Sequence, residues 1–454
     1  MADPDAIPTV IISNFAEAHI DFLGRSTSPA DRDELINGED YHGDRTILWD
    51  GHQKLVIVNY PIAHADLNLR RFGYEGTRYV YPDAPSHYLC LDILREGHLL
   101  QAMLDYAGEN RRLRIIPYAT TREFLSLLDH LRDNCGLDVE TPESPDRSHF
   151  WVRDYIDTKS GYRTLASYWM ADAEQFLPFG IVSTGLEQAA AAAFWFCSRG
   201  RPCVVKADTG ESGIGTTIIK PGPGVTVESI LKLLQSDPFY SDELVVVEEF
   251  IPSTQRISPS LEIRVPPEGD GDPLITYISI QLFLEFGDFC GIKIDRSVYE
   301  EPWCEKLQNR GLELARNLQN MGYVGHFDID CIVSDEGEAY MLEINSRRTG
   351  GTHVHEFAKH VFGDDYINRV SLISFEAASS GAITDAQELI KVLDEYLYPT
   401  PGTDPLGLVI TITSALHKHR FGYILVARTA ELALELKSRV EKTIQVYSNN
   451  PVET

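Results

Sequence analysis

The sequence is short of cysteine, of basic residues and of long apolar runs, and each shortage excludes a class of protein. Its 454 residues include seven cysteines without a C-x-x-C pair, so we expect reduced thiols in a cytoplasmic protein rather than a disulfide framework. Lysine and arginine number 40 against 68 acidic residues, which gives a net charge of -28. Because phosphate backbones select basic surfaces, this balance argues against nucleic-acid or anionic-membrane partners.

The longest apolar run, residues 189–197, is too short to span a bilayer, and the first residues lack the basic and apolar pattern of a signal peptide. We therefore expect no membrane partner. Hydrophobic residues nevertheless make up 43% of the chain, which is enough to form cores. The length predicts two to three domains.

Residues 1–145 alternate short apolar strands with helical segments, which predicts a small, mostly parallel α/β domain. The expected strands are 9–13, 55–58, 114–117 and 137–140. Thr120-x-x-Glu123 has the spacing of a capping box that opens a helix. No residue of this segment has a spacing typical of a catalytic or metal site. We interpret its histidines as surface residues: His19, His42, His52, His64, His87 and His98.

The most informative stretch is residues 325–355, GHFDIDCIVSDEGEAYMLEINSRRTGGTHVH. Its first half alternates polar and apolar side chains, as a half-buried strand does. The DEGE segment at 335–338 predicts a tight turn, and a second strand follows over 339–345. One face of this hairpin should be apolar, and we expect it to carry Phe327, Ile329, Cys331, Tyr340, Leu342 and Ile344.

Acidic side chains should gather on the other face of the hairpin. A two-residue loop at Glu336-Gly337 makes directly opposed residue numbers sum to 673, so that Asp330 faces Glu343 and Asp328 faces Asn345. Carboxylates this close repel unless a cation or a shared proton lies between them. Their hard oxygen atoms suit Mg²⁺ or Mn²⁺. The alternative is a solvated hairpin face whose charges meet by chance.

A strand that ends in Lys206 leads into the loop DTGESGIGTT at 208–217. The loop lacks the G-K-[ST] ending of a P-loop and the G-x-G-x-x-G order of a dinucleotide site. Lys206 could contact a phosphate while bare backbone N–H groups of the loop surround the others. The alternative is a plain hairpin turn before Ile218. Lys159 and Arg163, four residues apart in an expected helix, are on their own an ordinary solvated pair.

These features, together with an apolar strand that ends in Glu248-Glu249, follow the order and spacing of the ATP-grasp superfamily, which the chain resembles over about residues 153–360. The resemblance implies an α/β and α+β ATP-grasp fold whose two subdomains grip Mg-ATP. It implies that Asp330, Glu343 and Asn345 bind the metal, and that Arg347 and Lys206 act on the transferring phosphoryl group. The nucleotide-contacting residues that it implies are Lys159, Lys206, Gly210, Glu211, Ser212, Gly213, Ile214, Gly215, Glu248, Glu249, Phe250, Ile251 and Ile332.

One departure from the superfamily concerns the ribose. Many members have a carboxylate soon after the adenine-binding strand, whereas residues 252–259 here contain no acid before Glu262. No ribose-contacting residue is therefore assigned. The pair His353 and His355 could touch substrate, and as a zinc site it lacks further local ligands.

A narrower resemblance is to the pheganomycin-type peptide ligases, through Gln281 before Gly291, the extension at 348–353 and the segment 419–428. It implies a pre-ATP-grasp domain (1–145), an ATP-grasp core (146–370) and a small C-terminal domain (371–454). It also implies ADP-forming ligation, in which a carboxylate is activated as an acyl phosphate and joined to the amine of an amino acid or peptide. Two rivals stay open: a nucleotide-binding module without chemistry, and another ATP-grasp reaction such as that of a kinase or carboxylase. A homodimer also stays open.

Overall fold

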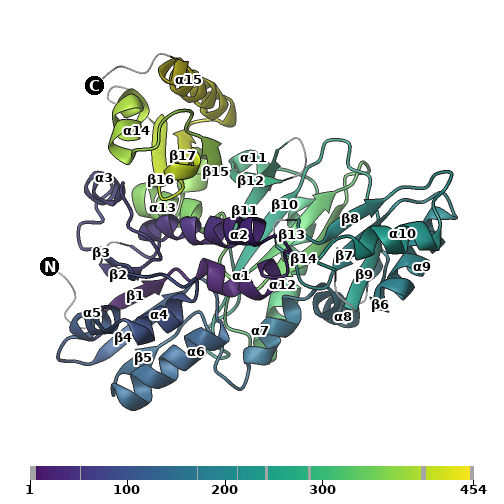
Figure 1. Ribbon diagram of the computed structural model, residues 1–454, viewed down its shortest axis with the longest axis horizontal. Helices are drawn as coiled ribbons and strands as arrows, with labels where there is room; N and C mark the ends of the chain where they lie inside the picture. The colour runs from purple at the N-terminus through teal and green to yellow at the C-terminus, as the bar shows by residue number, and fades with distance from the viewer. Residues whose placement is uncertain are drawn as a thin grey trace.

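The computed structural model describes residues 7–51, 53–170, 172–211, 213–240, 244–284, 288–399 and 405–449. Its strands form three sheets (Figure 1): a parallel N-terminal sheet at the lower left of the view, a four-stranded sheet at the right, and an eight-stranded sheet between them. In the ranges described, no helix is both long and apolar enough to cross a bilayer.

The N-terminal sheet has the order β3-β2-β1-β4-β5, and every neighbouring pair is parallel, as the α/β pattern predicts. Its strands are β1 (Thr9–Ile12), β2 (Lys54–Ile57), β3 (Arg78–Val80), β4 (Arg112–Pro117) and β5 (Asp138–Glu140). Its helices are α1 (Phe15–Leu23), α2 (Pro29–Tyr41), α3 (Ala65–Arg71), α4 (Leu89–Arg95), α5 (Gly97–Ala107) and α6 (Arg122–Asp129). Strands β1 and β2 are continuous apolar runs because helices cover both faces of the sheet.

Two details of this domain differ from the sequence predictions. The edge strand β3 was not predicted, because three residues carry no usable periodicity. The N-cap of α6 is Thr121, whose hydroxyl accepts a hydrogen bond from the Phe124 backbone N–H at 3.0 Å, so the capping box predicted at Thr120 begins one residue too early.

The four-stranded antiparallel sheet has the order β6-β9-β7-β8 and carries the predicted glycine loop between β7 and β8. Its strands are β6 (Gly180–Thr184), β7 (Cys203–Ala207), β8 (Thr216–Ile219) and β9 (Leu244–Glu249), and its helices are α9 (Leu186–Cys197) and α10 (Val227–Gln235). Helix α9 packs its alanine-rich side on the sheet, where Ala189, Ala190 and Ala193 are fully buried.

The eight-stranded antiparallel sheet has the order β14-β13-β10-β11-β12-β15-β17-β16. Its strands are β10 (Pro259–Val265), β11 (Leu274–Phe283), β12 (Phe289–Ile294), β13 (Gly325–Val333), β14 (Ala339–Asn345), β15 (Ser371–Ser379), β16 (Gly407–Ile412) and β17 (Arg420–Ala427). Its helices are α7 (Phe150–Ile156), α8 (Lys159–Trp169), α11 (Arg296–Tyr299), α12 (Cys304–Asn320), α13 (Thr352–Phe362), α14 (Ala386–Val392) and α15 (Ala430–Asn449).

The C-terminal segment continues this sheet while keeping a core of its own. Two residue pairs, Lys293 with Ile373 and Ile294 with Leu372, join β12 to β15. Helices α14 and α15 bury Leu389, Leu436 and other apolar residues on the far end of the sheet. We keep 1–145, 146–370 and 371–454 as the proposed domain boundaries.

The N-terminal domain is fixed to the large sheet by apolar and charged contacts. One apolar cluster contains Phe15 and Phe72 of the N-terminal domain together with Phe357 of α13 and Val426 of β17. Beside it lies a buried charge network. Arg348 binds both carboxylate oxygens of Glu143 in the linker that joins β5 to α7 (residues 141–149), with Nε–Oε2 and Nη2–Oε1 distances of 2.7 and 2.6 Å.

His326 on β13 completes this network. Its Nδ1 lies 3.0 Å from Glu262 Oε1, and its Nε2 lies 3.5 Å from Glu143 Oε1. Burial acts to lower the pKa of His326, but attraction by Glu143 and hydrogen bonds to both carboxylates outweigh it and raise this pKa to about 9. A protonated His326 between two buried carboxylates therefore helps to hold the linker on the sheet.

This predicts a pH-dependent stability. A histidine pKa that is raised on folding stabilises fully below the unfolded pKa of about 6.5, and the contribution is lost as the pH rises through about 9. We expect the difference in unfolding free energy between the natural protein and His326→Gln to shrink over this window, by at most about 3 kcal/mol. Urea unfolding from pH 6 to 10 measures it. His98→Gln, at an exposed site, is the control for the removal of an imidazole. A difference that stays constant with pH would contradict the prediction.

Candidate active site

The β13–β14 hairpin brings the predicted acidic residues together. Asp330 pairs with Glu343 and Asp328 pairs with Asn345, as predicted. The loop differs from the prediction: Ser334 and Glu338 close a turn around residues 335–337, and the register shifts after Asp330. The loop is one residue longer than predicted, and a bulge on β14 cancels this difference, so that Asp330 still pairs with Glu343. Because of the shift, the predicted apolar face is wrong for Tyr340 and Leu342, whereas Ile344 lies in the core as predicted.

The bulge decides which β14 side chains enter the core. Met341 is fully buried there, whereas Tyr340 and Leu342 are half-buried on the side of the acids, and Leu342 lines the cavity beside them. Strand β13 contains no bulge, so its side chains alternate regularly between the two faces of the sheet. Phe327, Ile329 and Cys331 therefore lie in the core as predicted. Ile332 lies on the other face and is half-buried.

Amide groups hold Asp330 in place. Gln281 Nε2 donates to Asp330 Oδ1 at 2.8 Å, and Asn345 Nδ2 donates to Asp330 Oδ2 at 3.0 Å. Burial and the charges of Asp328 and Glu343 hold the pKa of Asp330 well above its usual range, and burial raises the pKa of Asp328 to about 6. Carboxylates that resist ionisation side by side fit a divalent cation, which would remove their repulsion.

The two predicted lysines reach the same place from different elements. Lys159 is the first residue of α8, and its Nζ lies 3.2 Å from Glu343 Oε2. Lys206 is the last but one residue of β7, just before the glycine loop, and its Nζ lies 2.9 Å from Glu248 Oε2. Burial acts to raise the pKa of Glu343, but Lys159 and Lys206 outweigh it and lower this pKa.

Arg163 is a site residue that the sequence interpretation missed. It was interpreted as half of a solvated pair, but only 11% of its side chain is exposed, and its Nη2 donates to Glu248 Oε1 at 2.5 Å. Helical spacing could not show this, because the partner lies 85 residues away on β9. Glu248 is therefore compensated by two cations, Arg163 and Lys206.

The remaining residues of the predicted adenine site follow Glu248 at the end of β9. Glu249 Oε1 accepts a hydrogen bond from the Phe179 backbone N–H at 2.8 Å, and the Phe250 N–H donates to the Pro202 carbonyl oxygen at 3.3 Å. Ile251 is half-buried at the following position. The structure thus places Glu248–Ile251 on one strand end, near the lysines.

The glycine loop lies over Arg347. Arg347 Nη2 donates to the Glu211 carboxylate of the loop, and His19 Nδ1 lies 3.3 Å from the same carboxylate. Gly213 and Gly215 have φ values of +83° and +76°, which favour glycine. A side chain at Gly210 would come within 3.0 Å of Lys159 Nζ. Ile214 packs toward Phe22 of α1, and Ser212 lies outside the described residues.

Arg347 itself joins the hairpin to the N-terminal domain. Its Nε donates to Tyr118 Oη at 2.8 Å and its Nη1 donates to Asn345 Oδ1 at 2.8 Å. The N-terminal domain, in which no residue spacing indicated a site, thus contributes Tyr118 to the surroundings of Arg347. The interpretation of His19 and His64 as surface residues is wrong, because both are buried. A usable signal was available: Tyr118 follows the carboxyl end of the parallel strand β4, where ligands of open α/β sheets bind.

The site surrounds a cavity of about 260 Å³. The residues that line it come from all three proposed domains and include Glu39, His42, Arg45, Tyr118, Lys206, Gly210, Glu211, Gly213, Gln281, Asp328, Asp330, Leu342, Glu343, Asn345, Arg347, Gly350 and Glu376. The cavity thus contacts the acids of the hairpin, one lysine, Arg347 and the glycine loop together.

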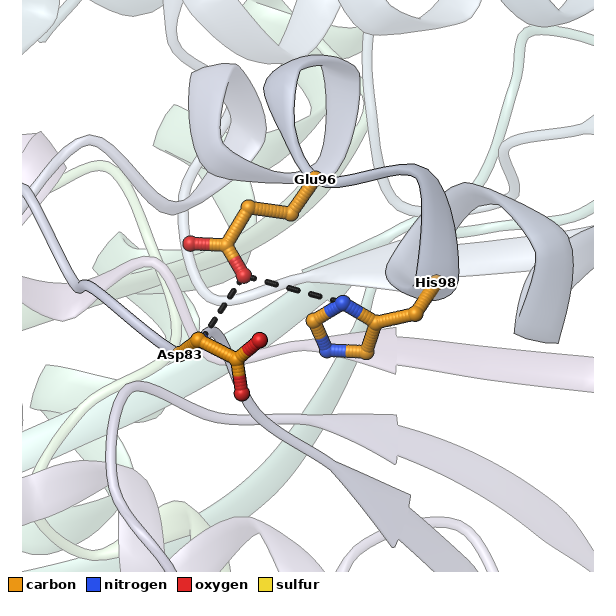
Figure 2. A group of neighbouring side chains, drawn as sticks. All are labelled: Asp83, Glu96 and His98. Atoms are coloured by element: carbon orange, nitrogen blue, oxygen red, sulfur yellow. Dashed lines mark hydrogen bonds and ion pairs between the residues drawn. The ribbon is translucent and has the colours of Figure 1, made fainter.

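Another group of metal-binding residue types lies on the N-terminal domain, namely Asp83, Glu96 and His98 (Figure 2). The Glu96 oxygens accept hydrogen bonds from the Asp83 and Ala84 backbone N–H groups at 2.7 and 3.1 Å. His98 Nε2 lies 3.1 Å from the Tyr81 carbonyl oxygen. These contacts fasten a loop to the start of α5, and we assign no metal to them.

Comparison with known proteins finds no match among family models or curated proteins. Solved structures match over nearly the whole chain. Biotin carboxylase of Campylobacter jejuni shares 14% identity, with a TM-score of 0.58 over 98% of this chain and 96% of its own. The biotin carboxylase domain of Hydrogenobacter thermophilus 2-oxoglutarate carboxylase, in complex with MgADP, ADP and bicarbonate, shares 14%, with a TM-score of 0.54 over 96% of this chain and 89% of its own.

The N5-carboxyaminoimidazole synthase of Aspergillus clavatus, in complex with ADP and 5-aminoimidazole ribonucleotide, shares 9% identity, with a TM-score of 0.54 over 97% of this chain and 99% of its own. The chain has the ATP-grasp fold. The predicted ATP-grasp fold class, with its N-terminal α/β domain and small C-terminal domain, is therefore confirmed. None of the three neighbours is a pheganomycin-type ligase, so that narrower resemblance enters below as a proposal.

Within this ATP-grasp fold, the closed glycine loop gives a prediction. Glu211→Gln removes the charge that holds the loop on Arg347, so we expect thermolysin to cut residues 208–217 about tenfold faster in the absence of nucleotide. A non-hydrolysable Mg-ATP analogue should slow the cutting of both proteins. Cleavage rates mapped by mass spectrometry measure this, with the exposed Glu187→Gln as control. Equal rates for Glu211→Gln and the natural protein would contradict the prediction.

Proposed function

We propose that this chain is an ADP-forming ligase that activates a carboxylate with Mg-ATP and joins it to an amine. One observation carries the proposal: a single cavity is lined by Asp330, Glu343 and Asn345 together with Lys206 and Arg347. Oxygen ligands for a divalent cation beside fixed positive charges suit a metal-bound polyphosphate.

In this proposal Asp330, Glu343 and Asn345 hold Mg²⁺, and Mn²⁺ suits the same oxygen atoms. When bound, Mg-ATP supplies the phosphoryl group, and the ion neutralises charge on the β- and γ-phosphates. On ATP binding, Lys159 gives up its contact with Glu343 and binds phosphate oxygens instead. Lys206 gives up its contact with Glu248 in the same way. The adenine lies against Glu248, the backbone of 249–251 and Ile332.

Arg347 holds the acceptor carboxylate and the phosphoryl oxygens in line. Its guanidinium is fixed by Tyr118 and Asn345, so little reorganisation is needed as charge develops. Closure of the loop at Gly210, Gly213 and Gly215 excludes water, which would otherwise hydrolyse the acyl phosphate. The ammonium group of the substrate first loses a proton to water. The neutral amine then attacks the acyl carbon, the bond from this carbon to the phosphate oxygen breaks, and phosphate leaves with the second amine proton, so no covalent enzyme intermediate is needed.

The finer proposal follows the pheganomycin-type resemblance, in which the amine belongs to an amino acid or peptide. A second candidate is carboxylation of an amine with bicarbonate as the activated carboxylate. It is favoured by the full-length likeness to biotin carboxylases and to N5-carboxyaminoimidazole synthase, one of them in complex with bicarbonate. Both candidates share phosphoryl transfer to a carboxylate oxygen and attack by a nitrogen.

ADP release separates the two candidates. The protein is incubated with Mg-ATP and four additions: a panel of organic acids, a panel of amino acids and dipeptides, both panels together, and bicarbonate with the amines. ADP that forms only with both panels supports the ligase, and ADP with bicarbonate and amine supports the carboxylase. Lys206→Met should abolish release in every arm, whereas the exposed Lys220→Met should not. ADP release that requires neither an acid nor bicarbonate would overturn the proposal.

A further inference from the structure

The cavity has a wall that the proposed phosphoryl transfer does not use. It is built by Glu39 near the end of α2, by His42 and Arg45 in the 3-10 segment that follows, and by Glu376 of β15. These residues come from the N-terminal domain and the C-terminal segment, so they meet only in the folded chain.

The wall is held together by its own contacts. Arg45 Nη1 donates to Glu376 Oε1. His42 lies between the two acids, with Nδ1 3.5 Å from Glu39 Oε2 and Nε2 3.5 Å from Glu376 Oε2. The guanidinium carbon of Arg45 lies 5.2 Å from the Phe15 ring centre, and this cation–π contact helps to hold the Arg45 side chain in place.

The two carboxylates of the wall differ in their partners. Arg45 pairs with Glu376, whereas the side chain of Glu39 lies beside the imidazole of His42. Burial acts to raise the pKa of Glu39, but the hydrogen bond and charge of His42 outweigh it and lower this pKa to about 2. Glu39 is therefore a carboxylate at neutral pH, and it can pair with a cationic group of a ligand.

The hairpin side of the cavity carries the cations Arg347 and Lys206 together with the acids Asp328, Asp330 and Glu343. The two sides are close: a Cβ on Gly350 would lie 2.7 Å from Glu376 Oε1, and three residues of chain from Arg347 to Gly350 span at most about 11 Å. A ligand that fills this space meets cations at one end and a carboxylate pair at the other.

We propose that Glu39 and Glu376, positioned by His42 and Arg45, bind the ammonium group of the amine substrate, and that this wall selects amino acids or peptides with a free amine. The role of the bound amine as a substrate rests on the proposed function. The binding of the amine to this wall does not. Bicarbonate carries no positive group that Glu39 and Glu376 could bind.

Binding is tested on the full chain by calorimetry, in the presence of MgADP. The probes are L-alanyl-L-alanine, the twenty amino acids singly, and N-acetyl-L-alanyl-L-alanine, which lacks the charged amine. We expect the best free-amine probe to bind, and its binding to weaken about 10- to 100-fold with Glu39→Gln, as for the loss of a hydrogen bond to a charged group. Glu34→Gln, at an exposed position of the same helix, is the matched control.

Glu376→Gln should weaken the same probes, and because it leaves Arg45 without its partner, its melting temperature is measured beside its affinity. If Glu376→Gln does not fold, Glu39→Gln alone decides. Equal affinity for acetylated and free peptides, no binding of any free amine, or unchanged affinity in Glu39→Gln would overturn the proposal. Amine binding without ADP release in any arm would reject the ligase function and keep the subsite, so the two failures are distinguishable.

Discussion

Glu343→Gln is expected to lower the rate of ADP formation about a hundred- to thousandfold, which corresponds to about 3–4 kcal/mol for a preorganised electrostatic contact. The substitution keeps the shape of the side chain but removes one charge from the proposed metal site and the partner of Lys159 at 3.2 Å. Because Lys159 and Lys206 stabilise the Glu343 carboxylate, this substitution should also lower the melting temperature.

Asp330→Asn provides the matched comparison. We expect a loss of rate as large as that of Glu343→Gln, but an unchanged or higher melting temperature, because the natural carboxylate is buried beside Asp328 and Glu343 and its loss relieves repulsion. Asp328→Asn should be milder, since Asp328 lies one pair farther along the ladder and accepts a hydrogen bond from Ser260 at 2.7 Å.

Steady-state rates and thermal unfolding of the three variants test the assignment. If Asp328→Asn proves the most damaging to the rate, the metal ligand lies one pair farther along the hairpin than proposed. If all three variants keep near-normal rates, the hairpin is not the metal site and the proposed mechanism fails with it.

The hairpin also shows how much of a site can be predicted from sequence patterns. Alternation on β13 is set by local burial, so Asp328 and Asp330 could be placed on one face from the sequence. The pairing with Glu343 and Asn345 was also predicted, although the loop was taken as one residue too short. The bulge on β14 restored the register, and bulges leave no period in a sequence that would reveal them.

Most residues that act across domains could not be found in this way. Tyr118 could have been suspected from its place after the carboxyl end of β4. His19 and Glu39 belong to the same α/β domain, whose pattern predicts its fold but not which of its helices and loops cover a neighbouring sheet. Arg163 was similarly hidden, because its spacing from Lys159 describes one helix and its partner Glu248 lies on β9. Local periodicity predicts elements and faces, whereas contacts between distant elements depend on how those elements pack.

The second large effect concerns stability. Arg348→Met is expected to lower the free energy of unfolding by about 3–5 kcal/mol, because removing one member of a buried ion pair leaves the other charge uncompensated. Arg348 is 3% exposed, binds both oxygens of Glu143, and its guanidinium carbon lies 4.7 Å from the Trp49 ring centre. Methionine keeps much of the apolar contact with Trp49, so the loss reports mainly on the charge.

Urea unfolding at pH 7 measures this loss, with the exposed Arg316→Met of α12 as a control that should stay within about 0.5 kcal/mol of the natural protein. The double variant Arg348→Met, Glu143→Gln removes both charges, so it should recover part of the stability that the single variant loses. His326 would then keep Glu262 as its carboxylate partner at 3.0 Å. A loss below about 1 kcal/mol in Arg348→Met would show that the apolar cluster around Phe15 and Phe357, rather than the ion pair, holds the N-terminal domain on the sheet.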